Sequence, residues 1–135
     1  MTALSCLKKY KMTLATLVLS GVLGNVGFNS IDKSIDVLKE DPRVMKTINL
    51  ETDLKLRAER GYVLDTKENL ERYQIDLKKY DELNTPEIRE KVSRYDSYET
   101  RGIAYTFGFI GSGIASFGFL SYEINKGRKS KGEDE

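Results

Sequence analysis

The chain has 135 residues, enough for one ordinary domain, and its 22 Lys and Arg nearly balance its 21 Asp and Glu. A net charge of +1 gives no overall field that would attract nucleic acid or acidic substrates. The chain has no histidine, the commonest general base and metal ligand, and its single cysteine, Cys6, fits no zinc spacing. The composition therefore favours a non-enzymatic protein with no cofactor, no metal site, no nucleic-acid partner and no evident small-molecule substrate.

Charged residues are distributed unevenly along the chain. Residues 12–31 contain none in 20 positions, and residues 102–122 contain none in 21. A helix of about 20 apolar residues spans a bilayer core of roughly 30 Å, and the rest of the chain is too charged to bury two such helices. We therefore predict transmembrane helices at 12–31 and 102–122. They divide the chain into a basic tail (1–11), a helical extramembrane segment (32–101) and a charged tail (123–135).

The N-terminal region permits two interpretations. Lys8, Lys9 and Lys11 precede an apolar stretch, as in a secretory signal peptide. No A-x-A-like cleavage site follows, and the uncharged run continues to Ile31. These features favour an uncleaved signal-anchor helix. Cleavage near Gly24, which would leave a singly anchored export product that binds something outside the cell, is the alternative.

Both uncharged windows carry small residues that recur on one face of a helix. Glycine opposes helix formation in water, but small residues are frequent in membrane helices, where they let backbones approach closely. Membrane helices also carry small residues that have no specific partner. We predict helix-packing roles for Ser20, Gly21, Gly24, Ala104, Gly108, Gly111, Ser112 and Ala115.

The charged segment 32–101 is predicted to be helical, with clear breaks. Apolar residues at a helical spacing extend the first helix beyond Ile31. Asp41 and Pro42 then supply the N-cap and first position of a second helix, and Gly61 can take the left-handed conformation at its end. The stretch from Asp65 to Glu68 predicts a capping box that opens a third helix.

Apolar and aromatic residues recur along this third helix at spacings of three and four, in a heptad-like, coiled-coil stripe. The stripe can serve an intramolecular bundle, can pair between chains, or can be plain core packing. It consists of Leu70, Tyr73, Leu77 and Tyr80.

The strongest break in the chain lies at Thr85 and Pro86, which supply the N-cap and first position of the last helix. No breaker separates Pro86 from Arg101, so the sequence predicts one helix from there through the second window. Such a helix is on the order of 60 Å long at 1.5 Å per residue.

The expected fold class is all-α. It is a membrane hairpin of two transmembrane helices joined by a charged, coiled-coil-like extramembrane segment. Basic residues in both tails favour cytoplasmic tails and an extracytoplasmic segment 32–101 by the positive-inside rule. Tyr10 and Tyr122 then lie at the same membrane face.

Neither window holds an ionisable residue at mid-depth, which argues against a proton relay or carrier site. The expected function is helix–helix association, as a small accessory or structural subunit of a membrane complex or as a homo-oligomer. Its partners are membrane lipids and other membrane-protein subunits or itself. A pore-forming or membrane-permeabilising protein is the alternative.

Two further features have simple interpretations beside functional ones. Asp32, Asp36 and Glu40 share a helix face that can attract a divalent cation, although a solvated acidic face is the simpler interpretation. Cys6 beside Lys8 and Lys9 is a candidate palmitoylation site, and an inert thiol in a short tail is the simpler interpretation.

Overall fold

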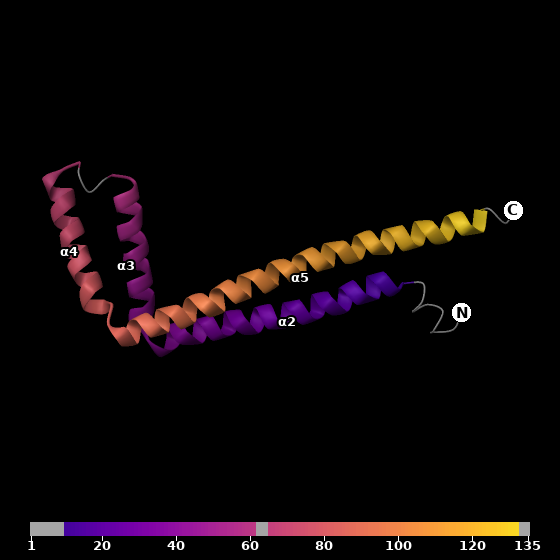
Figure 1. Cartoon of the computed structure of the whole chain (residues 1–135), viewed down its shortest axis with the longest axis horizontal. Helices are drawn as coiled ribbons and strands as arrows, with labels where there is room; N and C mark the ends of the chain where they lie inside the picture. The colour runs from indigo at the N-terminus through magenta and orange to yellow at the C-terminus, as the bar shows by residue number, and fades with distance from the viewer. Residues whose placement is uncertain (1–9, 62–64, 133–135) are drawn as a thin grey trace. The chain divides into compact units, whose positions relative to one another are not determined.

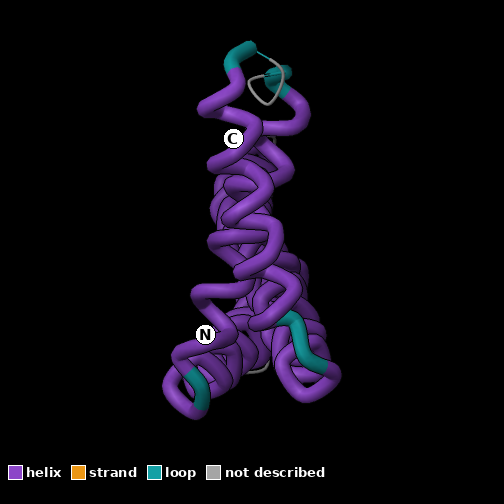
Figure 2. Tube along the Cα trace, turned by 90° about the vertical axis from the view of Figure 1, so that its left-hand side faces the viewer, coloured by secondary structure: helices purple, strands orange, loops and turns teal. Residues whose placement is uncertain are grey.

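The computed structural model describes residues 10–61 and 65–132, with side chains as far as Arg128. Within these ranges there are four helices and no strands (Figure 1): α2 (Lys11–Glu40), α3 (Pro42–Glu59), α4 (Lys67–Leu83) and α5 (Pro86–Gly132). Figure 2 shows the same all-helical composition, interrupted only by short loops and turns. The predicted all-α class is confirmed. Cys6, Lys8 and Lys9 lie outside the described residues.

The chain divides into two compact units. We call Met1–Ile31 with Thr100–Glu135 the apolar unit, and Asp32–Glu99 the charged unit. Helices α2 and α5 contribute residues to both units, whereas α3 and α4 belong to the charged unit alone.

The break between α2 and α3 lies where the sequence predicts it. Asp41 is the N-cap of α3, and its carboxylate accepts a hydrogen bond from the Arg43 backbone N–H at 3.0 Å. Pro42 occupies the first helical position, where a missing N–H costs nothing. Beyond the end of α3, Gly61 has a φ of +71°, the left-handed region that glycine tolerates without strain.

The predicted capping box at the start of α4 is wrong by one residue. The N-cap is Thr66, whose hydroxyl accepts a hydrogen bond from the Asn69 N–H at 3.1 Å. Asp65 therefore lies before the cap, and Glu68 falls within the first turn. Asp and Thr both cap helices well, so two adjacent candidates could not be distinguished by type alone.

Helix α5 begins at Pro86, as predicted, with Thr85 accepting a hydrogen bond from the Ile88 N–H at 3.3 Å. It runs through residue 101 without a break for 47 residues, which corresponds to about 70 Å. The helix continues ten residues beyond Tyr122, because no proline interrupts it before Gly132.

The charged unit has a small apolar core. Val37 of α2, Val44 of α3 and Ile88 of α5 meet there, none of them more than 4% exposed. Partly buried side chains surround them: Leu38, Ile48, Val92, Tyr95 and Tyr98. Helix α4, which Figure 1 shows beside α3, is described along its whole length and contributes no buried residue.

Candidate functional site

The most distinctive arrangement is the contact between α2 and α5 within the apolar unit. The two helices pair antiparallel, with Thr13 contacting Glu123, Gly24 contacting Phe109, and Ile31 contacting Gly102. The contact residues on each helix follow spacings of four and three, as in a coiled coil. We call this set the inner seam: Thr13, Thr16, Ser20, Gly24, Gly27 and Ile31 on α2, with Gly102, Thr106, Phe109, Gly113, Ser116 and Glu123 on α5.

Two glycines in the inner seam are required by the close approach of the backbones. A Cβ atom added to Gly102 would lie 2.6 Å from Ile31 Cγ1 and 3.2 Å from the Ile31 backbone nitrogen. At Gly27 it would lie 3.1 Å from the Thr106 backbone nitrogen. Backbone atoms cannot swing aside as a side chain does, so alanine at either position forces the helices apart.

Hydroxyl groups in the inner seam form hydrogen bonds between the helices. Ser20 Oγ donates to the Phe109 carbonyl at 3.1 Å, and Ser116 Oγ donates to Thr16 Oγ1 at 2.8 Å. Ser116 also approaches a carbonyl of its own helix, that of Ser112, at 2.8 Å. These polar groups are therefore satisfied within the helix pair and do not require water.

The carboxylate of Glu123 lies at one end of the inner seam. Glu123 of α5 accepts hydrogen bonds from the Met12 backbone N–H at 3.2 Å and from the Thr13 hydroxyl at 2.7 Å. The first N–H groups of a helix lack partners within the helix, so Glu123 caps α2 from the neighbouring helix.

The large apolar side chains of the apolar unit lie on its outside. Phe107, Ile114 and Phe117 are 71%, 69% and 76% exposed, whereas the seam consists largely of Gly, Ser and Thr. This distribution is the reverse of that in a water-soluble helix pair. Both helices are long and apolar enough to cross a membrane, judged by length and composition alone.

The predicted packing residues occupy two different surfaces. Ser20 and Gly24 lie in the inner seam. Gly108 and Ser112 are half-buried at its border, where a Cβ on Gly108 would lie 3.2 Å from Leu23 Cδ1. The other four are exposed, Gly21 on α2 and three residues on α5. We call the three on α5 the outer ladder: Ala104, Gly111 and Ala115.

Sequence reasoning missed Gly27, Gly102 and Glu123. The predicted set on α2 ends at Gly24, whereas a paired helix alternates spacings of four and three, which places Gly27 on the face of Gly24. The charge pattern places Glu123 in the C-terminal tail, because it ends the uncharged window. A heptad search for small residues would have found the two glycines.

In the charged unit, Asp41 joins the start of α3 to α5. Its side chain is 6% exposed and accepts hydrogen bonds from Arg43 Nη2 at 2.7 Å and Lys91 Nζ at 3.0 Å. Lys91 also contacts Glu87 at 2.7 Å. The hydrogen bonds from Arg43 and Lys91 hold the pKa of Asp41 far below its ordinary value. This network is a structural clamp, since every charge in it has a partner.

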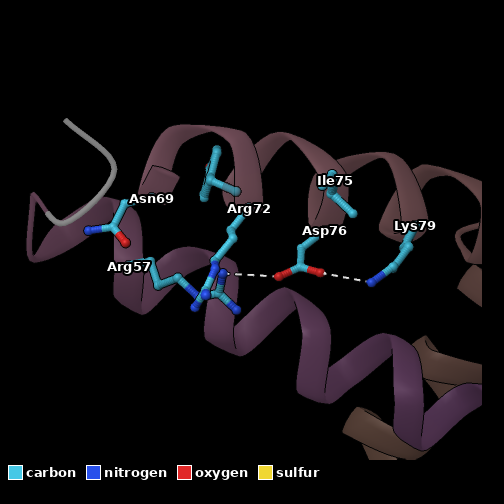
Figure 3. A pocket seen from close by; sticks show the side chains of 7 residues that line it. Arg57, Asn69, Arg72, Ile75, Asp76 and Lys79 are labelled. Atoms are coloured by element: carbon cyan, nitrogen blue, oxygen red, sulfur yellow. Dashed lines mark hydrogen bonds and ion pairs between the residues drawn. The ribbon is translucent and has the colours of Figure 1, made fainter. Parts of the chain in front are cut away.

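A cavity of 640 Å³ lies between α3 and α4 (Figure 3). Figure 3 shows Arg57 and Arg72 reaching into the same space from the two helices, with Asp76 and Lys79 beside them. Asp76 contacts Arg57 Nη1 at 3.0 Å and Lys79 Nζ at 3.3 Å. Burial acts to raise the pKa of Asp76, but the hydrogen bonds from Lys79 and Arg57 outweigh it and lower the value.

The charges around this cavity are balanced. Arg57 also forms an ion pair with Asp53, and Arg72 pairs with Glu68 at 2.7 Å. The three cations of the described lining are thus matched by the carboxylates of Asp53, Glu68 and Asp76. An anionic ligand would have to displace these pairs, so the cavity is better explained as the ion-paired contact between α3 and α4.

The predicted stripe on α4 is divided between two environments. Tyr73 and Tyr80 are half-buried, and burial together with the charge of Glu51 on α3 raises the pKa of Tyr80. Leu70 and Leu77 are 37% and 41% exposed. One half of the stripe therefore contributes to the contact with α3, and the other half faces outward.

The described residues contain no group of three His, Cys, Asp or Glu that could hold a metal ion. Asp32, Asp36 and Glu40 are exposed, which agrees with a solvated acidic face. No family model matches the chain, and neither a curated protein nor a solved structure matches it.

Proposed function

We propose that this chain is a non-enzymatic integral membrane protein whose α2 and α5 form a two-span hairpin, and that it acts by associating with other membrane helices. The observation that carries the proposal is the composition of the apolar unit, small and polar inside and large and apolar outside. Transfer of one large apolar side chain from water into hydrocarbon is favourable by about 1.5–3 kcal/mol. Many such side chains on the outside of one helix pair therefore favour a bilayer around it.

Association with further helices is supported by the outer ladder. In lipid the hydrophobic effect does not drive helices together, so close packing of small residues becomes the main contribution. Gly111 and Ala115 are exposed on α5, and a Cβ on Gly111 would meet no described atom within 4 Å. A second helix can approach the backbone closely there. We assign this surface to another membrane-protein subunit or to a second copy.

The orientation follows from the distribution of charge. Lys11, Lys126 and Arg128 flank the outer ends of the two apolar stretches, which favours cytoplasmic tails and an extracytoplasmic charged unit. An accessory or structural role is preferred over a pore because the seam hydroxyls of Ser20 and Ser116 are bonded to the opposite helix. They are therefore not available to line a water-filled path.

The test is the size of the assembly extracted from membranes in mild detergent. The variant Gly111→Leu with Ala104→Leu fills two exposed positions of the outer ladder. It should lower the native mass by removing the helices that pack against the outer ladder. Phe107→Leu with Ile114→Leu is the matched control, because it changes exposed apolar residues of the same helix without filling the ladder. An unchanged mass in the ladder variant would refute association through this face.

Membrane insertion is tested separately by alkaline carbonate extraction. The full chain should stay with the membrane pellet, since two spanning helices cannot be released by removing electrostatic contacts. Release into the supernatant would overturn the hairpin. Intact-mass measurement of the pelleted chain decides between an uncleaved anchor and cleavage near Gly24.

A further inference from the structure

Helix α4 is the least buried helix of the charged unit. The helices α2, α3 and α5 each supply a residue to the apolar core, whereas none of the 17 residues of α4 is buried. Leu70, Ile75 and Leu77 are 37%, 55% and 41% exposed. Since helix stability in proteins comes mostly from packing an apolar face, α4 has packing capacity that the contact with α3 does not use.

The two exposed leucines of the predicted stripe define one line along α4. Leu70 and Leu77 are seven residues apart, or about two helical turns, and therefore lie on the same side. Gln74 lies between them on that line. The half-buried residues that face α3 follow a neighbouring line: Asn69, Tyr73, Asp76, Tyr80 and Leu83. The leucine line is thus exposed, whereas the neighbouring line of half-buried residues contacts α3.

The charges beside the leucine line favour one orientation of a pairing helix. Lys67 and Glu71 lie at the N-terminal end, and Lys78 and Asp81 lie at the C-terminal end. Antiparallel pairing of two α4 helices brings Lys67 opposite Asp81 of a second copy, and Glu71 opposite Lys78. In a parallel pair each of these residues would face the opposite flank of the second copy, so neither attraction would form.

We propose that α4 pairs antiparallel with α4 of a second copy about a two-fold axis near Gln74, with Leu70 packed against Leu77 of the other chain. The contact is isologous, so both leucines of both chains are covered by a single arrangement. This inference rests on the proposed function of association and names a second copy as the partner. Because it uses only residues of α4, it can fail independently of the membrane hairpin.

Disulfide cross-linking of the full chain in native membranes tests the geometry. In a Cys6→Ser background, Gln74→Cys should give a covalent dimer by itself, because the two positions meet at the axis. Leu70→Cys and Leu77→Cys should each stay monomeric alone and should form a mixed dimer when the two variants are co-expressed. A dimer of Leu70→Cys with itself, or no dimer of Gln74→Cys, would overturn the proposal.

Charge exchange tests whether the pairing depends on the proposed contacts. In the Gln74→Cys background, Lys67→Glu should lower the dimer yield by roughly 3- to 10-fold, since two symmetry-related exposed pairs are lost. Adding Asp81→Lys should restore the yield. Lys67 and Asp81 are 14 residues apart on one helix and cannot contact each other within a chain, so rescue requires the second copy. Failure of the rescue would refute the antiparallel contact.

Carbonate extraction of the same samples separates the two proposals. A chain that stays in the pellet without cross-linking at Gln74→Cys would refute the α4 pairing and leave the membrane hairpin standing. A chain found in the supernatant would refute the hairpin, whatever the cross-linking result.

Discussion

The two units of this chain bury opposite kinds of side chain. The charged unit buries Val44 and Ile88 and exposes most of its acids and bases, with Asp41 buried as an ion pair. The apolar unit places Gly27 and Ser116 between its helices and exposes Phe117. Helices α2 and α5 each contribute residues to both units. Each of these two helices therefore carries both burial patterns along its length. Small residues between helices with large apolar residues outside are expected where hydrocarbon surrounds the helices, because lipid removes the advantage of burying large apolar side chains.

The largest expected effect comes from the core of the charged unit. Ile88→Ala removes a side chain that is 1% exposed and should destabilise this unit by about 2–5 kcal/mol. Amide hydrogen exchange of the full chain in detergent should accelerate across the charged unit and stay unchanged in the apolar unit. The control is Ile75→Ala, at a 55% exposed position, which should change exchange little. Equal effects of the two variants would contradict the apolar core.

The second effect should be confined to the apolar unit. Gly102→Ala places a methyl group against the backbone nitrogen of Ile31, and overpacking of this kind costs about 1–3 kcal/mol. A disulfide between cysteines introduced at Leu23 and Gly108 reports the helix contact, and its yield should fall. Gly111→Ala is the matched control, because open space surrounds that position in the described chain. If both alanines lower the yield equally, the backbones do not approach at Gly102.

A third, smaller effect tests the polar bonding of the seam. Ser116→Ala removes the hydrogen bond to Thr16, and such bonds between membrane helices are worth on average about 0.6 kcal/mol. The same disulfide yield between positions 23 and 108 should fall slightly. The Ser112 hydroxyl bonds to the Phe109 carbonyl of its own helix, so Ser112→Ala should leave the yield unchanged. A larger effect from Ser112→Ala would show that the seam bond is not the cause.

Local chemistry explains which parts of this structure could be predicted. The Asp41–Pro42 and Thr85–Pro86 breaks depend on residues that are neighbours in the sequence, so their types suffice to place the helix starts. The predicted N-cap of α4 was wrong by one residue, because Asp65 is by residue type as good a cap as Thr66.

Contacts between distant residues were not predictable in the same way. Gly102 is required because it meets Ile31, some 70 positions earlier, and that register appears only when the two helices are paired. Two ion pairs also join residues that are far apart in the sequence: Asp41 with Lys91, and Arg57 with Asp76. Many charged residues in this chain could form such pairs, and the sequence gives no reason to choose among them.

The smallest effect concerns two carboxylates of the charged unit whose pKa values move in opposite directions. Burial, with the like charges of Glu99 and Glu51, raises the pKa of Asp96. Charged Asp96 therefore lowers the stability of the unit. This cost is fully present above its raised folded-state pKa and disappears as the pH falls from there to the ordinary carboxylate pKa. Asp41 behaves oppositely: its pKa is lowered, so its stabilising contribution is fully present above the ordinary carboxylate pKa and declines progressively as the pH falls below that value.

Asp96→Asn should accordingly stabilise the charged unit at neutral pH by less than about 1 kcal/mol, since Asp96 is largely exposed and screened by solvent. Urea unfolding of the full chain in detergent, followed by helical circular dichroism, measures the difference between variant and native chain. The difference should shrink as the pH falls below the folded-state pKa of Asp96 and vanish below the ordinary aspartate pKa, because the carboxyl is then neutral in both the folded and the unfolded chain. Glu90→Gln removes an exposed acid of the same helix and should give no comparable gain. If Asp96→Asn destabilises the unit at neutral pH, the carboxylate makes a favourable contact that outweighs its burial and its repulsion by Glu51 and Glu99.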